Sequence, residues 1–327
     1  MVKIINAIVA ILAGVGGSVL LFWILNKIAD RLPGPWEDRI KPWAFIAPAV
    51  AVIALFLIYP AIRTLVFSFA NEDTTAWVGF ENYIDLLTSK EFLTVTLFNT
   101  LLWIALVPAS IVGVGLIVAV LADRLGPRGE KATKSVIFLP MAISMVAAGT
   151  IWIFVYAARP EGQDQVGILN AIWTAFGGNP VPWLQIDTLR LNSLLLMVIL
   201  VWMQAGFAMV LLSAAIKSVP EDTLEAARMD GANERQVFFR VVVPQIWPTV
   251  ITVFITVVIT VMKIFDVVYV MTGGNFRTDV IALRFFTELF ASGNNGKASA
   301  IVVLLMIMVT PILIYQVRQF RAQEAQR

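Results

Sequence analysis

The chain has 327 residues, of which 59% are hydrophobic and only 14% are charged. Its mean hydropathy of +0.84 is far too high for a soluble domain of this length, so the composition predicts a protein of the lipid bilayer. Cysteine and histidine are absent, which argues against disulfides, thiolate chemistry and most metal or hydrolytic centres. The net charge is +2, and the lysines and arginines lie in separate loops instead of one basic patch. The sequence therefore does not indicate nucleic-acid binding.

Seven apolar segments are long enough to cross a bilayer, since a spanning helix needs roughly 20 apolar residues. They are residues 4–25, 43–69, 92–122, 135–157, 191–216, 245–271 and 298–315. Several contain a proline, which is tolerated where neighbouring helices or water satisfy the freed carbonyls. These prolines are Pro48, Pro60, Pro108, Pro140 and Pro248. The sequence therefore predicts an all-α polytopic membrane protein whose helices form a packed, kinked bundle.

The distribution of lysine and arginine predicts the orientation, because cytoplasmic loops carry an excess of positive residues. The loops after the first, third and fifth segments and the C-terminal tail are rich in them, and the alternate loops hold few. The rich positions include Lys27, Arg31, Arg39, Lys41, Arg124, Arg128, Lys131, Lys134, Lys217, Arg228, Arg235, Arg240, Arg318 and Arg321. We therefore expect the N-terminus outside and the C-terminus inside.

The first apolar segment has two interpretations, a cleaved signal peptide or a retained span. Only Lys3 precedes it and several positive residues follow it, which favours a retained accessory helix. Pro33, Gly34 and Pro35 predict a break in the linker that follows. The expected organisation is an accessory helix and linker over residues 1–42, a six-span domain over 43–321 and a tail over 322–327.

Residues 217–244 form a polar stretch between two apolar segments, and their capping residues predict two short helices. Ser218 with Glu221 has the spacing of a capping box, and so has Asn233 with Gln236. Gly231, between the two expected helices, can adopt the left-handed conformation that closes a helix. The stretch is thus predicted to be a helical hairpin.

The first helix of this hairpin suits a docking role better than a catalytic one. Leu224, Ala227 and Arg228 share a face, and Ala226 is small enough to let another surface approach closely. At the end of the stretch, Pro244 disfavours a helical Val243, so we expect a break or kink there. The alternative is an ordinary loop with a hairpin and no partner.

The spacing of the hairpin residues supplies further information. Glu225-Ala226-Ala227, three residues, Gly231, nine residues and then Val241-x-Val243-Pro244 resembles the EAA loop of binding-protein-dependent ABC importer permeases. In that family the pattern ends Ile-x-Leu-Pro, so the two valines are a conservative departure. The resemblance implies that Glu225, Ala226, Ala227, Asp230, Gly231 and Pro244 dock on a separate ATPase.

The six spans over residues 43–321 resemble the core of the sugar-type permeases of this family. Three aromatic-rich motifs add to the likeness, although each alone is explained by packing or by a membrane-interface position. They are Trp77-Val-Gly-Phe-Glu-Asn-Tyr83, Trp202-x-Gln204-x-Gly206-Phe207 and Phe265-Asp266-Val-Val-Tyr269-Val-Met-Thr272-Gly-Gly274. Lys263 before the last motif resembles the α-glucoside permeases locally.

The resemblance implies a pore-forming subunit in the bacterial inner membrane. Its implied partners are a cytoplasmic ATPase dimer, a second and different permease subunit, an extracytoplasmic solute-binding protein and a sugar. The chain contains no phosphate-binding Gly-x-x-x-x-Gly-Lys-Ser/Thr loop, so ATP and magnesium are expected on the ATPase and no cofactor on this chain. The tryptophans Trp173 and Trp183 of a long outer loop fit either a protein partner or the membrane interface.

Two other classes compete with this interpretation. An ion-coupled secondary transporter needs intramembrane acids or histidines, and Asp266 is the one clear intramembrane acid. A membrane enzyme needs clustered acids or nucleophiles at one interface, which the sequence does not offer.

A polar stripe in the 245–271 segment is the candidate substrate path. Its members recur at three- and four-residue steps and are Thr249, Thr252, Thr256, Thr260 and Lys263. Asp266, Tyr269 and, in another span, Gln204 are further candidates. The alternative is structural: membrane threonines often bond their own helix carbonyls, and Lys263 with Asp266 can be a simple ion pair.

Overall fold

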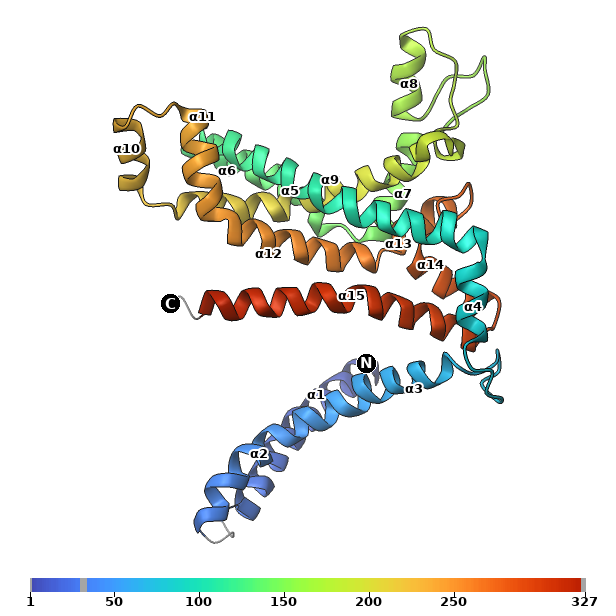
Figure 1. The fold of residues 1–327 in the computed structure, drawn as a ribbon, viewed down its shortest axis with the longest axis vertical. Coiled ribbons are helices and arrows are strands. Elements are labelled where there is room, and N and C mark those ends of the chain that lie inside the picture. The colour runs from blue at the N-terminus through green and yellow to red at the C-terminus, as the bar shows by residue number, and fades with distance from the viewer. Residues whose placement is uncertain (1, 30–33, 325–327) are drawn as a thin grey trace. The chain divides into compact units, whose positions relative to one another are not determined.

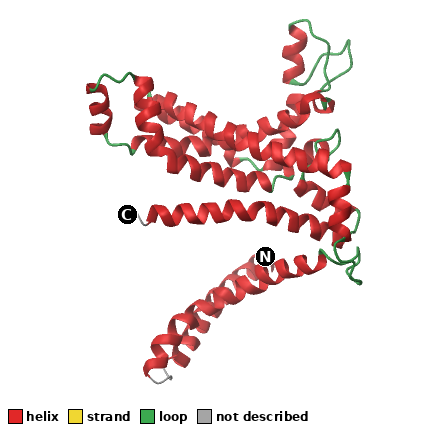
Figure 2. Cartoon of the chain, viewed as in Figure 1, coloured by secondary structure: helices red, strands yellow, loops and turns green. Residues whose placement is uncertain are grey.

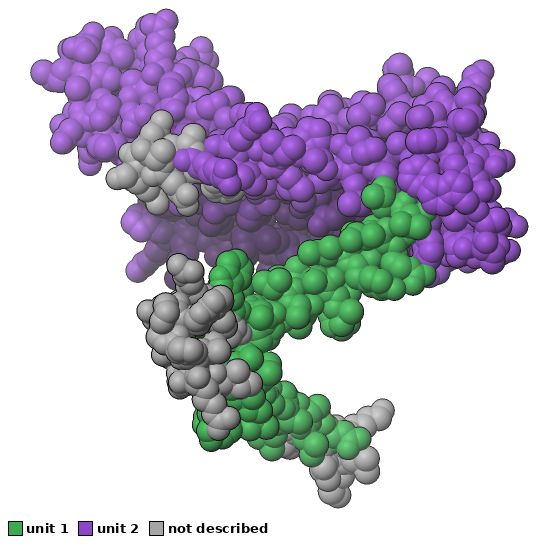
Figure 3. All heavy atoms as spheres, turned by 60° about the horizontal axis from the view of Figure 1, so that its bottom comes forward, with its two compact units in different colours: residues 1–66 green, residues 67–327 purple. Residues whose placement is uncertain are grey.

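The structure is a computed structural model that describes residues 2–29 and 34–324. Helices make up most of this part of the chain (Figure 2), and its one β-bridge, between Ala70 and Trp77, is isolated. The chain forms two compact units, residues 1–66 and 67–327 (Figure 3). The boundary falls near the end of the first expected core span, 43–69.

The first unit is a pair of long apolar helices. They are α1 (Val2–Ala29) and α2 (Gly34–Ile53), the latter prolonged by the π-helical turn η1 (Ala54–Ile58) and α3 (Tyr59–Phe67). Phe22 of α1 stacks on Phe45 of α2 with ring centroids 5.9 Å apart. The expected linker 26–42 is helical outside residues 30–33, so that prediction was too long, and Pro33 lies outside the described residues.

Residues Phe45–Phe67 are long and apolar enough to span a bilayer, as expected for the first core span. The apolar stretch of α1 is shorter, Leu12–Lys27. The accessory span therefore stays a prediction.

The second unit is a bundle built around three long helices, α5, α9 and α12, which lie side by side (Figure 1). A bilayer forces each of these apolar segments to satisfy its backbone internally, which only a helix does. The helices of this unit are α4 (Glu81–Thr88), α5 (Phe98–Asp123), α6 (Pro127–Phe138), α7 (Met145–Tyr156), α8 (Ile168–Ala175), α9 (Leu191–Lys217), α10 (Glu221–Met229), α11 (Glu234–Val237), α12 (Val243–Met262), α13 (Asp266–Thr272), α14 (Ile281–Phe286) and α15 (Asn295–Glu324).

Several shorter turns join these helices. They are the π-helical η2 (Phe92–Leu97), η6 (Phe238–Val242) and η7 (Thr287–Ala291), and the 3₁₀ turns η3 (Leu139–Ala142), η4 (Trp183–Gln185) and η5 (Thr188–Arg190). Among the described residues of the whole chain, five helices are long and apolar enough to span a bilayer, or six if one bent pair is counted as a span.

The bent pair corrects the expectation of one straight span over residues 135–157. Residues Pro127–Ala142 and Met145–Tyr156 meet at 103°. The helix tightens to a 3₁₀ turn at Pro140, and the backbone is then extended at Ile143 and Ser144. Ser144 caps α7 by accepting a hydrogen bond from the Ala147 amide at 3.2 Å. Proline and cap together explain the corner.

Two glycines allow α9 to approach its neighbours closely. A Cβ added to Gly206 would lie 2.5 Å from the Ile137 carbonyl oxygen and 2.7 Å from the Phe138 Cα. One added to Gly115 of α5 would lie 2.6 Å from the Cβ of Ala208. Gly206 belongs to the Trp202-x-Gln204-x-Gly206 motif, so packing explains that glycine.

Packing also explains the Trp77–Tyr83 motif. Asn82 donates to the carbonyls of Ser68 and Ala70 at 3.0 and 2.8 Å, and the Tyr83 hydroxyl bonds the Ser68 hydroxyl at 2.6 Å. Trp77 stacks on Phe69, with ring centroids 5.4 Å apart. The motif fastens the chain after Phe67 to the start of α4.

Candidate functional site

The polar hairpin predicted at residues 218–244 is present as α10 and α11 at one end of the second unit (Figure 1). Gly231 has φ +84°, and its amide donates to the Arg228 carbonyl at 3.0 Å. The Ala232 amide then donates to the Ala227 carbonyl at 3.1 Å. This left-handed turn closes α10 as expected, because glycine has no Cβ to clash there.

One of the two expected capping boxes is present. The Gln236 amide donates to the Asn233 side chain at 2.9 Å, and the Asn233 amide donates to the Gln236 side chain at 2.8 Å. The prediction of a capping box at Ser218 and Glu221 was wrong. The Ser218 hydroxyl donates backwards to the Ala215 carbonyl at 2.7 Å, and α10 begins after Pro220 without a side-chain cap.

The two faces of α10 differ in exposure. Leu224 and Ala227 are half-buried and pack against the core of the second unit. Glu225, Ala226, Asp230 and Gly231 are exposed. Five of the six expected docking residues, the four exposed ones and Ala227, thus lie within the hairpin, and Ala227 supports it from the inner face.

An ion pair joins the two helices of the hairpin. The Arg228 Nε donates to Glu234 Oε1 at 2.9 Å, and this contact raises the pKa of Arg228 above its usual range. Both side chains are largely exposed, so water and salt screen the pair and it contributes little stability. Next to it, the apolar side chain of Met229 is 88% exposed.

The sixth expected docking residue, Pro244, lies in the first turn of α12 and is exposed. The break expected there is absent, because α11, η6 and α12 run on as one helix, Glu234–Met262. The π-helical turn immediately before Pro244 relieves the clash of its ring with the preceding carbonyl. The sequence thus predicted a distorted helix near Pro244, but it did not predict that the distortion would be a π-helical turn.

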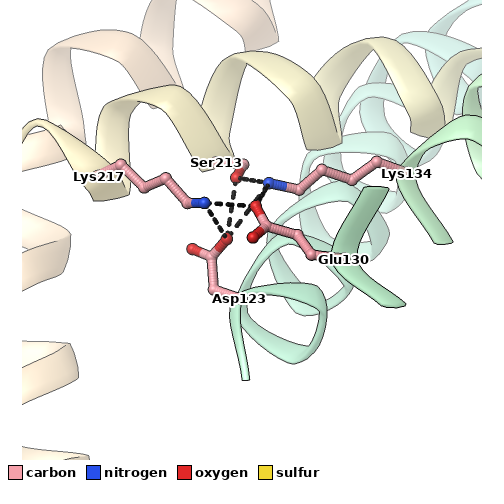
Figure 4. Close-up of polar contacts among 5 residues, drawn as sticks. All are labelled: Asp123, Glu130, Lys134, Ser213 and Lys217. Atoms are coloured by element: carbon pink, nitrogen blue, oxygen red, sulfur yellow. Dashed lines mark hydrogen bonds and ion pairs between the residues drawn. The ribbon is translucent and has the colours of Figure 1, made fainter. Parts of the chain in front are cut away.

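A five-residue polar cluster lies at the base of the hairpin and was not predicted (Figure 4). It connects the end of α5, the first turns of α6 and the end of α9. Lys134 Nζ lies 2.5 Å from Glu130 Oε1, 3.3 Å from Asp123 Oδ1 and in contact with the Ser213 hydroxyl. Lys217 bonds Glu130 and lies 3.6 Å from Asp123.

The charges of this cluster balance, with two lysines against two carboxylates. Ser213 is buried, and its hydroxyl also donates to Asp123 at 3.2 Å. Lys217 is followed within four residues by the start of α10. The cluster therefore ties the root of the hairpin to α5 and α6. The one signal for this cluster in the sequence was the number of charged residues at the ends of two spans that are neighbours in the structure.

The candidate substrate path differs from the expected continuous helix. α12 ends at Met262, and residues 263–265 are not helical, so the expected single span 245–271 was wrong. α13 begins afresh at Asp266 and ends at Gly273, which has φ +59°. Non-helical backbone at membrane depth is tolerated where it is buried in protein or lines a water-filled cavity.

The threonines of α12 follow the structural alternative. The Thr252, Thr256 and Thr260 hydroxyls donate to the carbonyls of Pro248, Thr252 and Thr256 at 2.9, 2.8 and 3.1 Å. Each hydroxyl thus has a partner within its own helix, four residues back. They still have acceptor capacity for a ligand.

Lys263 and Asp266 flank the break and do not pair. Among the residues that the structure describes, neither takes part in an ion pair, so the alternative of a simple structural pair was wrong. Lys263 is exposed and lines a cavity of about 300 Å³ with aromatic and aliphatic side chains of the 265–305 region. A lysine that lacks an anionic partner beside a break is available for a ligand.

Tyr269 is half exposed and belongs to an aromatic group around the break. Its ring lies 5.1 Å from that of Phe265 and 5.5 Å from that of Phe286. Gln204 is half-buried in the middle of α9. Of the six expected path residues, Lys263 alone lines the 300 Å³ cavity, so the structure does not gather them all in one pocket.

The end of the bundle away from the hairpin holds a half-buried acid, Asp279, that was also not predicted. Asp279 accepts a hydrogen bond from Thr96 at 2.8 Å and from the Val280 amide at 2.9 Å. Burial raises its pKa from 3.8 to about 6. Asn99, fully buried, donates to the carbonyls of Arg277 and Asp279 at 2.7 and 3.0 Å. Within the described chain no three acidic side chains gather as metal ligands would.

The long loop between α7 and α9 is folded around α8. Asn170 is fully buried, donates to the carbonyls of Ala157 and Val181, and accepts from the Val181 amide. Along α8 and just after it, Ile168, Ile172 and Phe176 recur every four residues and are 59%, 53% and 86% exposed. This apolar stripe has no cover within the described chain.

Comparison with known proteins agrees with these features. Residues 111–322 match the family described as "Binding-protein-dependent transport system inner membrane component". The chain is 40% identical over 332 residues to an alpha-glucoside transport system permease protein of Rhizobium meliloti, covering 97% of both chains. It is 45% identical over 283 residues to an osmoprotective compounds uptake permease protein of Synechocystis, covering 86% of this chain and 100% of the relative.

The fold also has a solved counterpart. A chain of a bacterial ABC transporter involved in the import of alginate matches with a TM-score of 0.75 and 21% identity, over 88% of this chain and 98% of that chain. The match supports a permease fold for the helical bundle. The family match, the two relatives and the spans together show that this chain belongs to the inner-membrane components of binding-protein-dependent ABC transport systems and is a multi-pass membrane protein.

Proposed function

We propose that this chain is the pore-forming permease subunit of an ATP-driven importer that takes up a neutral sugar or glucoside. The observation that carries the proposal is the α10–α11 hairpin, whose exposed face bears Glu225, Ala226 and Asp230 in a chain of this family. The alpha-glucoside transport relative named above supports a sugar cargo, and the other relative is named for the uptake of osmoprotective compounds.

ATP and magnesium are assigned to a separate cytoplasmic ATPase dimer. The hairpin would lie in a groove of that ATPase, with Met229 as an apolar anchor and Glu225 and Asp230 as its charged rim. Gly231 and the Asn233–Gln236 box would hold the hairpin in shape. Closure of the ATPase on ATP then moves the hairpin and, through it, the spans. This places the hairpin in the cytoplasm, with the N-terminus outside.

The cargo would pass the break after Met262. Lys263 and Asp266 supply a donor and an acceptor for sugar hydroxyls, and the Tyr269 ring supplies a flat apolar surface for the sugar's carbon–hydrogen face. Thr256, Thr260 and Gln204 would contribute further polar groups along the path. An uncharged cargo fits a site with one cation and one anion better than a strongly anionic cargo would.

Two more partners complete the proposal. The exposed stripe of Ile168, Ile172 and Phe176 offers an extracytoplasmic solute-binding protein an apolar surface. A second and different permease subunit is proposed as the other half of the pore, as in the sugar-type importers that the sequence resembles.

The test is to isolate the assembled complex through an affinity tag on this chain and to reconstitute it with its binding protein. We expect uptake of an α-linked diglucoside that depends on ATP, with little uptake of free glucose or sn-glycerol 3-phosphate. A complex that contains no ATPase chain, or uptake driven by a proton or sodium gradient without ATP, would contradict the proposal.

A further inference from the structure

A second cavity lies at the hairpin end of the second unit, away from the candidate path. It measures about 590 Å³ and is lined by residues of α6 together with Val210 of α9. On α6, Lys131 and Ser135 are four residues apart and Phe138 is three residues further, so they share one face. The cavity borders the cluster of Figure 4 through Glu130 and Lys134.

The cavity is polar at one end and apolar at the other. Lys131 and Phe138 are separated by seven residues, or about 10 Å along the helix. The apolar residues of α6 follow Ser135, at Val136, Ile137 and Phe138, so Lys131 lies in the polar part of the helix and Phe138 at its apolar end. Phe138 and Val210 are 42% and 41% exposed. This gradient matches an amphiphile whose head is held by Lys131 and Ser135 and whose chain lies against Phe138 and Val210.

The charges at the polar end favour an anion. The carboxylates nearby are already engaged, because Glu130 and Asp123 are paired with Lys134 and Lys217. By contrast, Lys131 and the adjacent Arg128 form no ion pair with any described residue, and both are exposed. The net charge left at this end is positive. Basic pockets between spans at the membrane boundary are a recurring form of site for anionic headgroups.

We propose that this cavity binds an anionic phospholipid, with the phosphate at Lys131 and Ser135 and an acyl chain against Phe138 and Val210. The lipid would brace α6 against α9 beside the cluster that anchors the hairpin. The site is independent of the sugar path, and it holds whichever cargo the importer carries.

The test titrates the delipidated, assembled complex with phosphatidylglycerol and, separately, with phosphatidylcholine, and counts bound lipids by native mass spectrometry. We expect phosphatidylglycerol to bind about fivefold more tightly, the preference typical of one lysine near an anionic headgroup. Lys131→Gln should abolish this preference. Val210→Trp should weaken binding of both lipids by filling the apolar end. Arg235→Gln, an exposed cation at the same end outside this cavity, is the matched control and should change neither.

Three results would overturn the proposal. An unchanged lipid preference in Lys131→Gln, together with unchanged binding of both lipids in Val210→Trp, would show that the lipid binds elsewhere. Binding of inorganic phosphate that displaces phosphatidylglycerol and is insensitive to Val210→Trp would show a site for free anions. Loss of a second permease chain from the purified complex in either variant would show that the cavity is a subunit interface.

Discussion

The Thr96 hydroxyl donates to the Asp279 carboxylate at 2.8 Å, although the two residues are 183 positions apart in the sequence. The bond joins the turn before α5 to the segment before α14, at the end of the bundle away from the hairpin. It holds a carboxyl that burial makes difficult to ionise, since its pKa is raised from 3.8 to about 6.

This raised pKa predicts a pH dependence of stability. Between pH 3.8 and about 6 the folded protein binds a proton that the unfolded chain has released, so stability falls as pH rises through this window and then stays level. A shift of this size corresponds to about 3 kcal/mol. Asp279→Asn should remove this pH dependence of stability. The variant should therefore melt at a higher temperature than the unchanged protein at pH 7, and this gain should be smaller at pH 4. Scanning fluorimetry of both proteins at several pH values checks this, and an unchanged pH profile would contradict it.

Gly231 is expected to be the most sensitive position of the hairpin turn. Its φ of +84° costs a β-branched residue about 1 to 2 kcal/mol, whereas asparagine tolerates this conformation. Gly231→Val should therefore reduce co-purification of the ATPase or uncouple hydrolysis from uptake, and Gly231→Asn should change little. Equal behaviour of the two variants would mean that the turn conformation does not matter for coupling.

Gly206 is expected to be intolerant for a different reason, the contact of α9 with Ile137 and Phe138. Gly206→Ala should destabilise the chain by about 1 to 3 kcal/mol, because its Cβ would overlap backbone atoms. Gly113→Ala in α5 meets open space and is the matched control. Thermal unfolding in detergent measures the difference, and equal melting temperatures would refute the close contact.

Lys263 and Asp266 are predicted to act on transport and not on assembly. Lys263→Met and Asp266→Asn each remove one group beside the break while leaving the ATPase contacts untouched. We expect at least a tenfold loss of uptake, equivalent to the loss of about 1.4 kcal/mol of interaction, with basal hydrolysis intact. Normal uptake in both variants would leave the break as a structural feature alone.

The orientation can be measured because the chain has no cysteine. Single cysteines at Arg128 and Asn233 should react with a membrane-impermeant reagent only from the cytoplasmic side, and cysteines at Asp73 and Gln163 only from outside. These four positions are exposed. Labelling with the sides exchanged would reverse the proposed topology and move the hairpin out of reach of ATP.

Local signals in the sequence predicted local structure well. Gly231 and the Asn233–Gln236 capping box interact only with residues a few positions away, so their spacing in the sequence was sufficient to predict the turn and the start of α11. Ser218 failed because its hydroxyl had a competing acceptor in the preceding turn, the Ala215 carbonyl. The break at Lys263 contains neither proline nor glycine, and apolar residues lie on both sides of it. A prediction based on hydrophobicity therefore extended one helix across the break.

Features that depend on tertiary contacts were not predictable from one sequence. Asp123 and Lys217 are 94 positions apart (217 minus 123), and only the packing of α5 against α9 brings them to 3.6 Å. The same is true of Thr96 and Asp279. The charge or polarity of these residues indicated that each needs a polar partner, but the sequence did not indicate which residue that partner is.

The uninterrupted helix from Glu234 to Met262 has a mechanical consequence. Its 29 residues make a rod about 43 Å long, with the hairpin at one end and the non-helical joint at Lys263 at the other. A continuous helix therefore links the two sites, so a displacement of the hairpin is expected to reach the joint. Beyond the joint, α13 packs chiefly on α7, so the segments on the two sides of the joint are held by different contacts.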